Sequence, residues 1–179
     1  PEFAGEYPAV TMADEILVEG AEQIRAMVTS AGNPVLSVPG GKKLDQAFAG
    51  LEFMVSIDYY INETTRYADL ILPPALNLHG GHFDIIFNVL SVRNTVKYSK
   101  AVFPKESGTK YDWEIFIELT ERIAQKKGKK YPKLNHLLSR RFGPEWLLDL
   151  GIRLGEYGSL KSFSKWNGLS LTKIKKQMH

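Results

Sequence analysis

The first strong pattern along the chain is a largely apolar run at residues 24–30, which follows a polar stretch at residues 19–23. Its length and apolar content predict a β-strand that is buried on both faces. The run ends at Ala31-Gly32-Asn33-Pro34, where glycine and asparagine tolerate positive φ and proline interrupts backbone hydrogen bonding. The pattern therefore predicts a strand that is followed at once by a sharp turn.

A helix and a second strand follow this turn. In the segment 42–49, Leu44, Ala47 and Phe48 share one helical face, and Gly50 stands at the position of a C-cap. Residues 51–57 predict a second buried strand, with Asp58 directly after it. Strand, helix and strand joined by short connections predict a βαβ unit, in which the two strands are parallel and the crossover is right-handed.

The next part of the chain predicts a third strand between irregular connections. The polar and aromatic residues 59–68 predict a loop with one helical turn, and residues 69–72 predict a short parallel strand that Pro73-Pro74 ends. Residues 78–83 form a glycine-bearing loop, and residues 89–98 alternate partly as an edge strand does. We therefore expect a sheet that is mostly parallel.

The remainder of the chain is mainly helical in pattern. Asp112 is expected as the N-cap of a helix at residues 113–123. That helix has one apolar face, made of Phe116, Leu119, Thr120 and Ile123. Beyond it the pattern predicts, in order, a solvated basic turn at 126–130, helices at 134–138 and 146–154, a turn-rich segment at 155–168 and a final basic stretch.

Together these elements predict an α/β fold, a three-layer Rossmann-like domain with a mostly parallel sheet, followed by a helical C-terminal extension. We expect the α/β domain at residues 1–125 and the helical extension at residues 126–179.

Composition narrows the functional classes. The chain has 179 residues, and its formal net charge of +3 comes from lysines concentrated after Lys126, so nucleic acid is not an expected partner. The absence of cysteine excludes disulfides, thiolate metal sites and iron–sulfur ligation by this chain. No apolar run approaches the roughly 18 residues that a membrane span needs. The opening Pro1-Glu2-Phe3 indicates a cloning scar or the cut end of a longer chain.

Candidate binding residues follow the predicted parallel strands, because ligands of such sheets bind outside the carboxyl ends of the strands. The Gly32-Asn33-Pro34 turn offers backbone N–H groups to a phosphate. Asp58 has a carboxylate that suits the N1–H and exocyclic amine of guanine, and Asn62 and Thr64 follow it closely. The alternatives are a plain tight turn for the tripeptide and caps of the next turn for the other residues.

A second cluster raises the question of a metal. His79, His82 and Asp84 lie along one glycine-bearing loop, and histidine and carboxylate are ligands of zinc and iron. No fourth ligand stands nearby, and the alternative is that the histidines pack against Phe83 and Phe87. We therefore predict no metal site and no catalytic residue in this chain.

Taken in order, these segments resemble a known family, the molybdopterin-dependent oxidoreductases of the dimethyl sulfoxide reductase type, which include formate dehydrogenases and nitrate reductases. The resemblance runs from about residue 21 to residue 123. It is carried by Gly32-Asn33-Pro34, by the strand that ends in Ser56-Ile57-Asp58, by Asp112-Trp113-Glu114 and, most specifically, by Asn62-Glu63-Thr64-Thr65-Arg66-Tyr67-Ala68-Asp69-Leu70-Ile71-Leu72-Pro73.

The resemblance implies that this chain is a fragment of an enzyme that holds molybdopterin guanine dinucleotide with molybdenum or tungsten. Gly32-Asn33-Pro34 would then lie along the ribose and phosphate of one dinucleotide, and Asp58, Asn62 and Thr64 would hold its guanine. The metal ligand, the iron–sulfur cysteines and the C-terminal barrel have no counterpart here, and the loop at 78–82 lacks the acidic residue common in the family. We therefore expect the fragment to be inactive and, in isolation, to have no cofactor bound.

The expected partners are the remaining domains of the parent chain, toward which the lysine-rich segment 173–177 would be a linker. Apolar residues of the predicted helix at 146–154 also favour self-association if they are exposed; they are Trp146, Leu147, Leu148, Leu150 and Leu154. The alternative function is a free-standing guanine-nucleotide-binding α/β module without redox activity.

Overall fold

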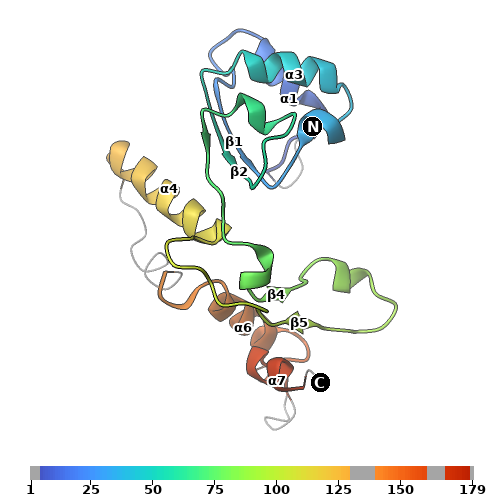
Figure 1. The fold of residues 1–179 in the computed structure, drawn as a ribbon. Helices are drawn as coiled ribbons and strands as arrows, with labels where there is room; N and C mark the ends of the chain where they lie inside the picture. Colours follow the sequence, from blue (N-terminus) through green and yellow to red (C-terminus); the bar gives the residue numbers. More distant parts are fainter. Residues whose placement is uncertain (1–4, 130–139, 161–167, 178–179) are drawn as a thin grey trace. The chain divides into compact units, whose positions relative to one another are not determined.

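The computed structural model describes residues 5–129, 140–160 and 168–177. The chain forms two compact units, unit 1 at Pro1–Pro74 and unit 2 at Ala75–His179 (Figure 1). The boundary between the units thus follows the Pro73-Pro74 pair. The expected functional division between residues 1–125 and 126–179 stays a prediction.

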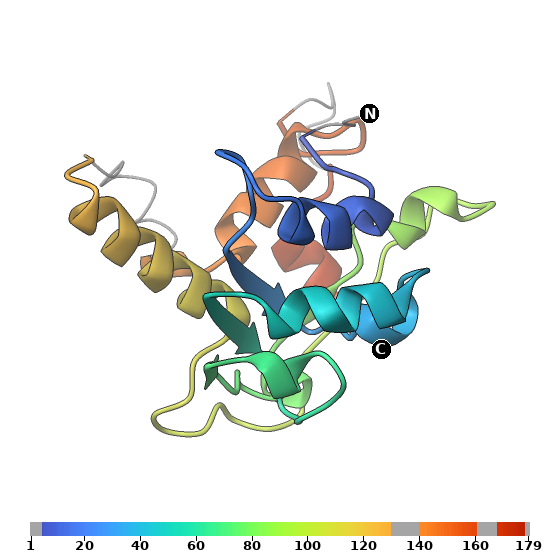
Figure 2. The ribbon, with the colours of Figure 1, turned by 90° about the horizontal axis from the view of Figure 1, so that it is seen from above.

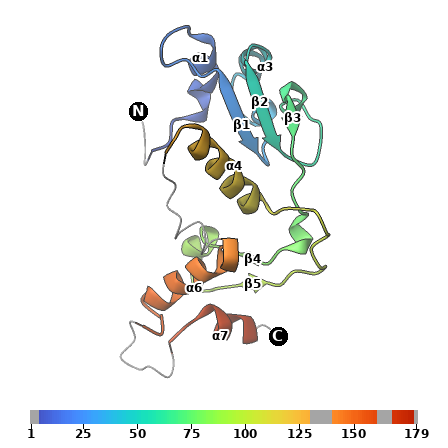
Figure 3. The same cartoon turned by 90° about the vertical axis from the view of Figure 1, so that its left-hand side faces the viewer.

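Unit 1 is a small α/β unit that contains the predicted βαβ arrangement. Its three strands are parallel in the order β1-β2-β3 (Figure 3). In the register, Met27 lies beside Met54 and Val55 beside Leu70. The elements of unit 1 are the 3-10 helix η1 (Ala9–Thr11), α1 (Met12–Leu17), β1 (Ala26–Ser30), α2 (Pro34–Ser37), α3 (Gly41–Ala49), β2 (Phe53–Ile57), the 3-10 helix η2 (Thr65–Tyr67) and β3 (Leu70–Ile71).

The core of unit 1 lies between the sheet and the helices α1 and α3, which run next to each other (Figure 2). The predicted face of α3 is the buried one, since Leu44, Ala47 and Phe48 are all buried. They pack with residues of α1 and with Met54 of β2. The helix begins against the preceding turn, where a Cβ on Gly41 would lie 2.1 Å from the carbonyl oxygen of Val35. Only glycine fits there.

One prediction for unit 1 is wrong, because β1 is not buried on both faces. Its side chains alternate between exposed and half-buried positions. Val28, Phe53 and Leu70 share one face of the sheet by the strand register and are exposed, whereas Val55 and Ile57 on the same face are buried. The helices α1 and α3 pack on the opposite face. The structure establishes an α/β unit with a small parallel sheet, but it does not confirm the three-layer arrangement.

Unit 2 combines short strands with helices. The strands β4 and β5 pair in antiparallel fashion, with Phe83 beside Tyr98. Its core contains Tyr98, Leu171 and Ile174. The described elements are the 3-10 helix η3 (Asn77–His79), β4 (His82–Phe83), the 3-10 helix η4 (Phe87–Leu90), β5 (Tyr98–Ser99), α4 (Asp112–Lys126), α6 (Glu145–Leu154) and α7 (Leu171–Lys176).

Two expectations for unit 2 need correction. The expected edge strand at 89–98 is wrong, since that segment begins within η4 and only Tyr98 enters a strand. The helix α4 was expected with Asp112 as its N-cap, but its N-cap is Tyr111, whose backbone N–H donates to Glu114 Oε2 at 2.7 Å. The helix itself is confirmed, but most of the face predicted from its spacing is exposed, at Phe116, Thr120 and Ile123, and the buried residue is Ile115.

The C-terminal helices agree in part with the sequence. The expected helix at 146–154 is confirmed as α6, in which Leu147, Leu150 and Leu154 are exposed. The lysine-rich segment lies mostly in α7, in which Leu171 and Ile174 are buried. Its expected role as a linker stays a prediction. The expected helix at 134–138 lies outside the described residues. Among the described helices, none combines the length and the apolar character that a membrane crossing requires.

Candidate functional site

The candidate site lies where β1 and β2 end. After β1, Ala31 adopts a positive φ of 49° and donates its backbone N–H to the carbonyl oxygen of Ile57 at 3.0 Å. The chain then turns at Gly32, and α2 begins at Pro34 with Asn33 as its N-cap residue. Proline suits this first helical position because its φ is already helical and no N–H is required there. The predicted turn is thus confirmed, and a short helix opens directly from it.

Asp58 stands at the carboxyl end of β2 and is half-buried. Its Oδ1 accepts the backbone N–H of Tyr59 at 2.6 Å and that of Tyr60 at 3.3 Å. These bonds fix the orientation of the carboxylate, and they are the bonds expected if Asp58 caps the next turn. A carboxylate has acceptor capacity for about four hydrogen bonds, so the same group retains capacity for a ligand.

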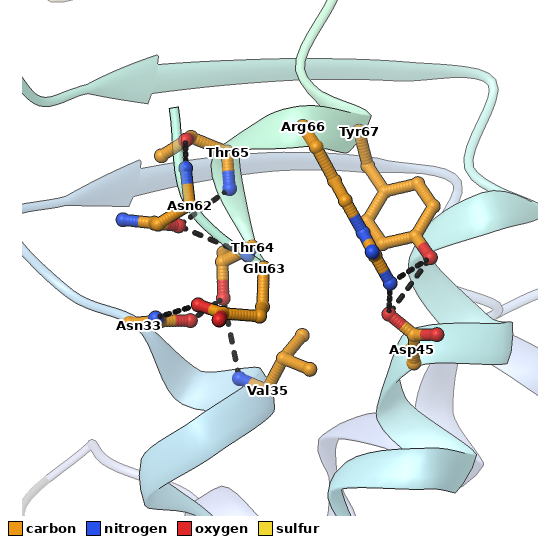
Figure 4. A network of polar contacts seen from close by, with 9 residues as sticks. All are labelled: Asn33, Val35, Asp45, Asn62, Glu63, Thr64, Thr65, Arg66 and Tyr67. Carbon is orange, nitrogen blue, oxygen red and sulfur yellow. Dashed lines mark hydrogen bonds and ion pairs between the residues drawn. The ribbon is translucent and has the colours of Figure 1, made fainter. Parts of the chain in front are cut away.

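Thr64 joins the loops that follow β1 and β2 (Figure 4). Its hydroxyl donates to Asn33 Oδ1 at 2.8 Å and accepts the backbone N–H of Val35 at 3.2 Å. The Asn33 side chain makes no capping bond to its own helix, so Thr64 satisfies a first-turn N–H of α2 from a different loop. The side chain is fully buried, with 0% exposure. Thr64 therefore acts on the site by holding the turn in place.

Asn62 shapes its own loop in the same way. Its Oδ1 accepts the backbone N–H groups of Thr64 and Thr65, each at 2.9 Å. In return, its backbone N–H donates to Thr65 Oγ1 at 2.8 Å (Figure 4). That hydroxyl donates to the carbonyl oxygen of Tyr60. These bonds fold the segment into the tight turn before η2. The structure thus brings the predicted site residues Asn62, Thr64 and Asn33 together. The bonds described here join these residues to one another.

Glu63 belongs to this cluster and was not predicted. Its Oε2 accepts from Asn33 Nδ2 at 2.7 Å. This hydrogen bond, followed by one from its own backbone N–H, lowers the pKa of Glu63 below its ordinary value. The only sequence signal was its place in the Asn62-Glu63-Thr64 element. Its partner Asn33 lies 30 positions away, and local patterns do not report such a contact.

The next residues of this element have structural contacts. Asp69 locks β3 onto β2, because its Oδ2 accepts the backbone N–H of Met54 at 2.7 Å. Arg66 and Tyr67 both donate to Asp45 Oδ1 on α3, at 2.5 Å and 2.7 Å (Figure 4). The Tyr67 hydroxyl first, and then the Arg66 guanidinium, lower the pKa of Asp45.

In the histidine-containing loop of unit 2, His79 and Asp84 make local contacts. His79 Nδ1 hydrogen-bonds to the carbonyl oxygen of Pro104, and its ring lies 6.1 Å from that of Phe103 rather than against Phe83 or Phe87. Asp84 Oδ1 accepts the backbone N–H of Phe87 at 2.8 Å. Within the described ranges, no three histidine, cysteine, aspartate or glutamate side chains are grouped so as to hold a metal ion.

The fold and the site define unit 1 as a small parallel α/β unit with polar residues at its strand ends, a class in which such ends commonly bind ligands. No family model matches the chain. Relatives of known type were found, however. The chain is 28% identical over 117 residues to the probable oxidoreductase YyaE of Bacillus subtilis (strain 168), a match that covers 65% of this chain and 17% of that protein.

Two further relatives extend this result. The assimilatory nitrate reductase catalytic subunit of Bacillus subtilis (strain 168) is 29% identical over 102 residues, which cover 57% of this chain and 14% of that protein. The F420-dependent formate dehydrogenase subunit alpha of Methanocaldococcus jannaschii is 27% identical over 134 residues, which cover 74% of this chain and 19% of that protein. The matched part thus spans less than one fifth of each relative.

The homologues of this chain are therefore oxidoreductases of the molybdopterin, dimethyl sulfoxide reductase type. The resemblance predicted from Gly32-Asn33-Pro34 and the segment 62–73 is confirmed at this level.

Proposed function

We propose that this chain binds the guanosine and phosphate end of a molybdopterin guanine dinucleotide and so forms part of a molybdopterin-dependent oxidoreductase. One observation carries the proposal: Asp58 directly follows β2, and two backbone N–H groups fix its carboxylate there. A carboxylate accepts two parallel hydrogen bonds from the N1–H and the exocyclic amine of guanine, and charge-assisted pairs of this kind are both strong and specific.

The turn after β1 fits the phosphate part of the same ligand. A Cβ on Gly32 would come no closer than 3.7 Å to its nearest described neighbour, the carbonyl oxygen of Ser30. The side of Gly32 where a side chain would stand is thus uncrowded, and the backbone of Gly32-Asn33-Pro34 is accessible to a phosphate oxygen. In this proposal, Asn62 and Thr64 support the site by holding the two loops together.

The bound dinucleotide would supply two-electron redox chemistry at its metal, whereas this chain would bind and orient the remote end of the cofactor. We propose that the chemistry at the metal requires further parts of a parent enzyme, so that the chain alone supports binding without turnover. The second helical layer of a three-layer domain would likewise come from outside unit 1, against the exposed part of the sheet face, which holds Val28, Phe53 and Leu70.

The test is a calorimetric titration of the 179-residue chain with GMP and, in parallel, with AMP at one fixed salt concentration. We expect tighter binding of GMP, and we expect Asp58→Ala to lose about 2–3 kcal/mol of GMP affinity, the value of a charge-assisted double contact. Asp84→Ala is the matched control, because Asp84 also accepts a loop N–H but lies in unit 2. Unchanged GMP affinity in Asp58→Ala would remove the guanine role.

A further inference from the structure

Glu63 presents a carboxylate of fixed orientation beside the turn after β1 (Figure 4). The Asn33 amide donates to its Oε2, and its own backbone N–H also bonds the carboxylate. The other end of the Asn33 amide is held by the buried Thr64 hydroxyl. These bonds hold the carboxylate in one orientation. Because Glu63 is only half-buried, its carboxylate remains accessible to a ligand.

The charge of Glu63 has no cationic partner among the described residues. No described lysine, arginine or histidine nitrogen lies within 4.0 Å of its carboxylate oxygens. The neighbouring Arg66 forms its ion pair with Asp45, and its positive charge acts on Glu63 only as the smallest of the causes that lower the pKa of Glu63. Because the pKa of Glu63 is lowered, the group is ionised at neutral pH. An oriented anion that has spare acceptor sites and makes no ion pair suits neutral hydroxyl or amide donors.

We propose that Glu63 accepts hydrogen bonds from the ribose hydroxyls of the bound guanosine, while Asp58 reads the base. This inference rests on the proposed function of the strand-end site. Glu63 lies on the loop that follows Asp58, and its hydrogen bond from Asn33 places it beside the turn after β1. The ligand group is thus a vicinal diol, whose two O–H donors match the remaining acceptor sites of one carboxylate.

The test compares GMP, 2′,3′-dideoxy-GMP and AMP on the full 179-residue chain. We expect the wild type to bind GMP about tenfold more tightly than the dideoxy analogue, the value of one hydrogen bond to a charged acceptor. Glu63→Gln should reduce this ratio to about threefold or less, because a neutral hydrogen bond is roughly half as strong. The same variant should keep the preference for GMP over AMP.

Thr64→Val is the matched control for a purely structural role. It removes the buried hydroxyl that holds Asn33 but keeps the carboxyl group of Glu63 and its charge. We expect it to weaken all three nucleotides by a similar factor without changing the ratio of GMP to dideoxy-GMP. If Glu63 only positioned the loop, Glu63→Gln would behave in the same way, and that result would overturn the ribose role.

The outcomes for the two proposals are separable. A wild-type chain that prefers GMP to AMP but binds dideoxy-GMP equally well overturns the role of Glu63 and leaves the proposed function standing. Equal binding of GMP and AMP overturns the guanine role of Asp58. The ratio of the affinities for GMP and dideoxy-GMP still decides the role of Glu63. A chain that binds none of the three nucleotides overturns both proposals.

Discussion

Two polar clusters flank the 3-10 helix η2 in unit 1, and they differ mainly in burial (Figure 4). On one side, Thr64 with 0% exposure joins the turn after β1 through Asn33 and Val35. On the other side, Arg66 pairs with Asp45 on α3, and these side chains are 49% and 32% exposed. Sequence neighbours thus take part in one cluster that is centred on a buried hydroxyl and in another that is an exposed ion pair.

The difference has an energetic meaning. An exposed ion pair is weakened by water and salt and typically contributes little to stability. A buried hydrogen bond contributes a modest amount when made, but leaving its donor or acceptor unpaired costs more. We therefore expect the geometry of the candidate site to depend on the Thr64 cluster, and the Asp45 cluster to adjust only how η2 rests on α3.

The largest effect is expected for Thr64→Val, which conserves shape but removes the hydroxyl. The backbone N–H of Val35 loses its acceptor and Asn33 Oδ1 loses its donor, so we expect a loss of about 1–3 kcal/mol in the free energy of unfolding. Urea denaturation measures it. Thr120→Val is the control, because Thr120 is exposed and bonds only within α4. Equal losses in the two variants would break the comparison.

The sequence predicts the helices and strands of unit 1 better than it predicts the hydrogen bonds of the candidate site. The face of α3 with Leu44, Ala47 and Phe48 follows from helical spacing, and the parallel strands follow from short connections around that helix. The Asn33–Glu63 and Thr64–Val35 bonds do not follow, because they join residues about thirty positions apart whose approach depends on the folded loops.

Unit 2 shows the same limit for elements rather than contacts. The helix α6 is predicted because its apolar periodicity is long. The strand β5 contains only Tyr98 and Ser99, and two residues are too few for an alternating pattern to be detected. The burial of Ile115 on α4 depends on which residues pack against that helix. Short elements and burial faces are therefore decided by tertiary packing.

A smaller effect is expected for Asp45→Asn, which removes the charge from the exposed cluster. We expect a slight fall in the melting temperature at low salt that shrinks at high salt, since the Arg66 pair is partly screened already. The pKa of Asp45 is lowered, so the contribution of its charge is present above the ordinary carboxyl range and is lost as the pH falls through the lowered pKa. A salt-independent loss as large as that of Thr64→Val would contradict the assignment by burial.

The smallest effect on stability at neutral pH is expected in unit 2, where Glu118 on α4 forms exposed ion pairs with Lys110 and Arg122. Lys110 and, second, Arg122 lower the pKa of Glu118 from 4.5 to about 2. Stabilisation by the ionised carboxylate is therefore complete above about pH 4.5 and is lost as the pH falls toward 2. We expect Glu118→Gln to melt almost like the wild type in high salt at neutral pH, and the difference at low salt to vanish on acidification.

Thermal melts of Glu118→Gln and the wild type from pH 7 to pH 2 at two salt concentrations test this expectation. A difference between Glu118→Gln and the wild type that persists in high salt would show that an exposed cluster can act as the buried one does. Burial would then no longer explain why Thr64, rather than Asp45, sets the candidate site.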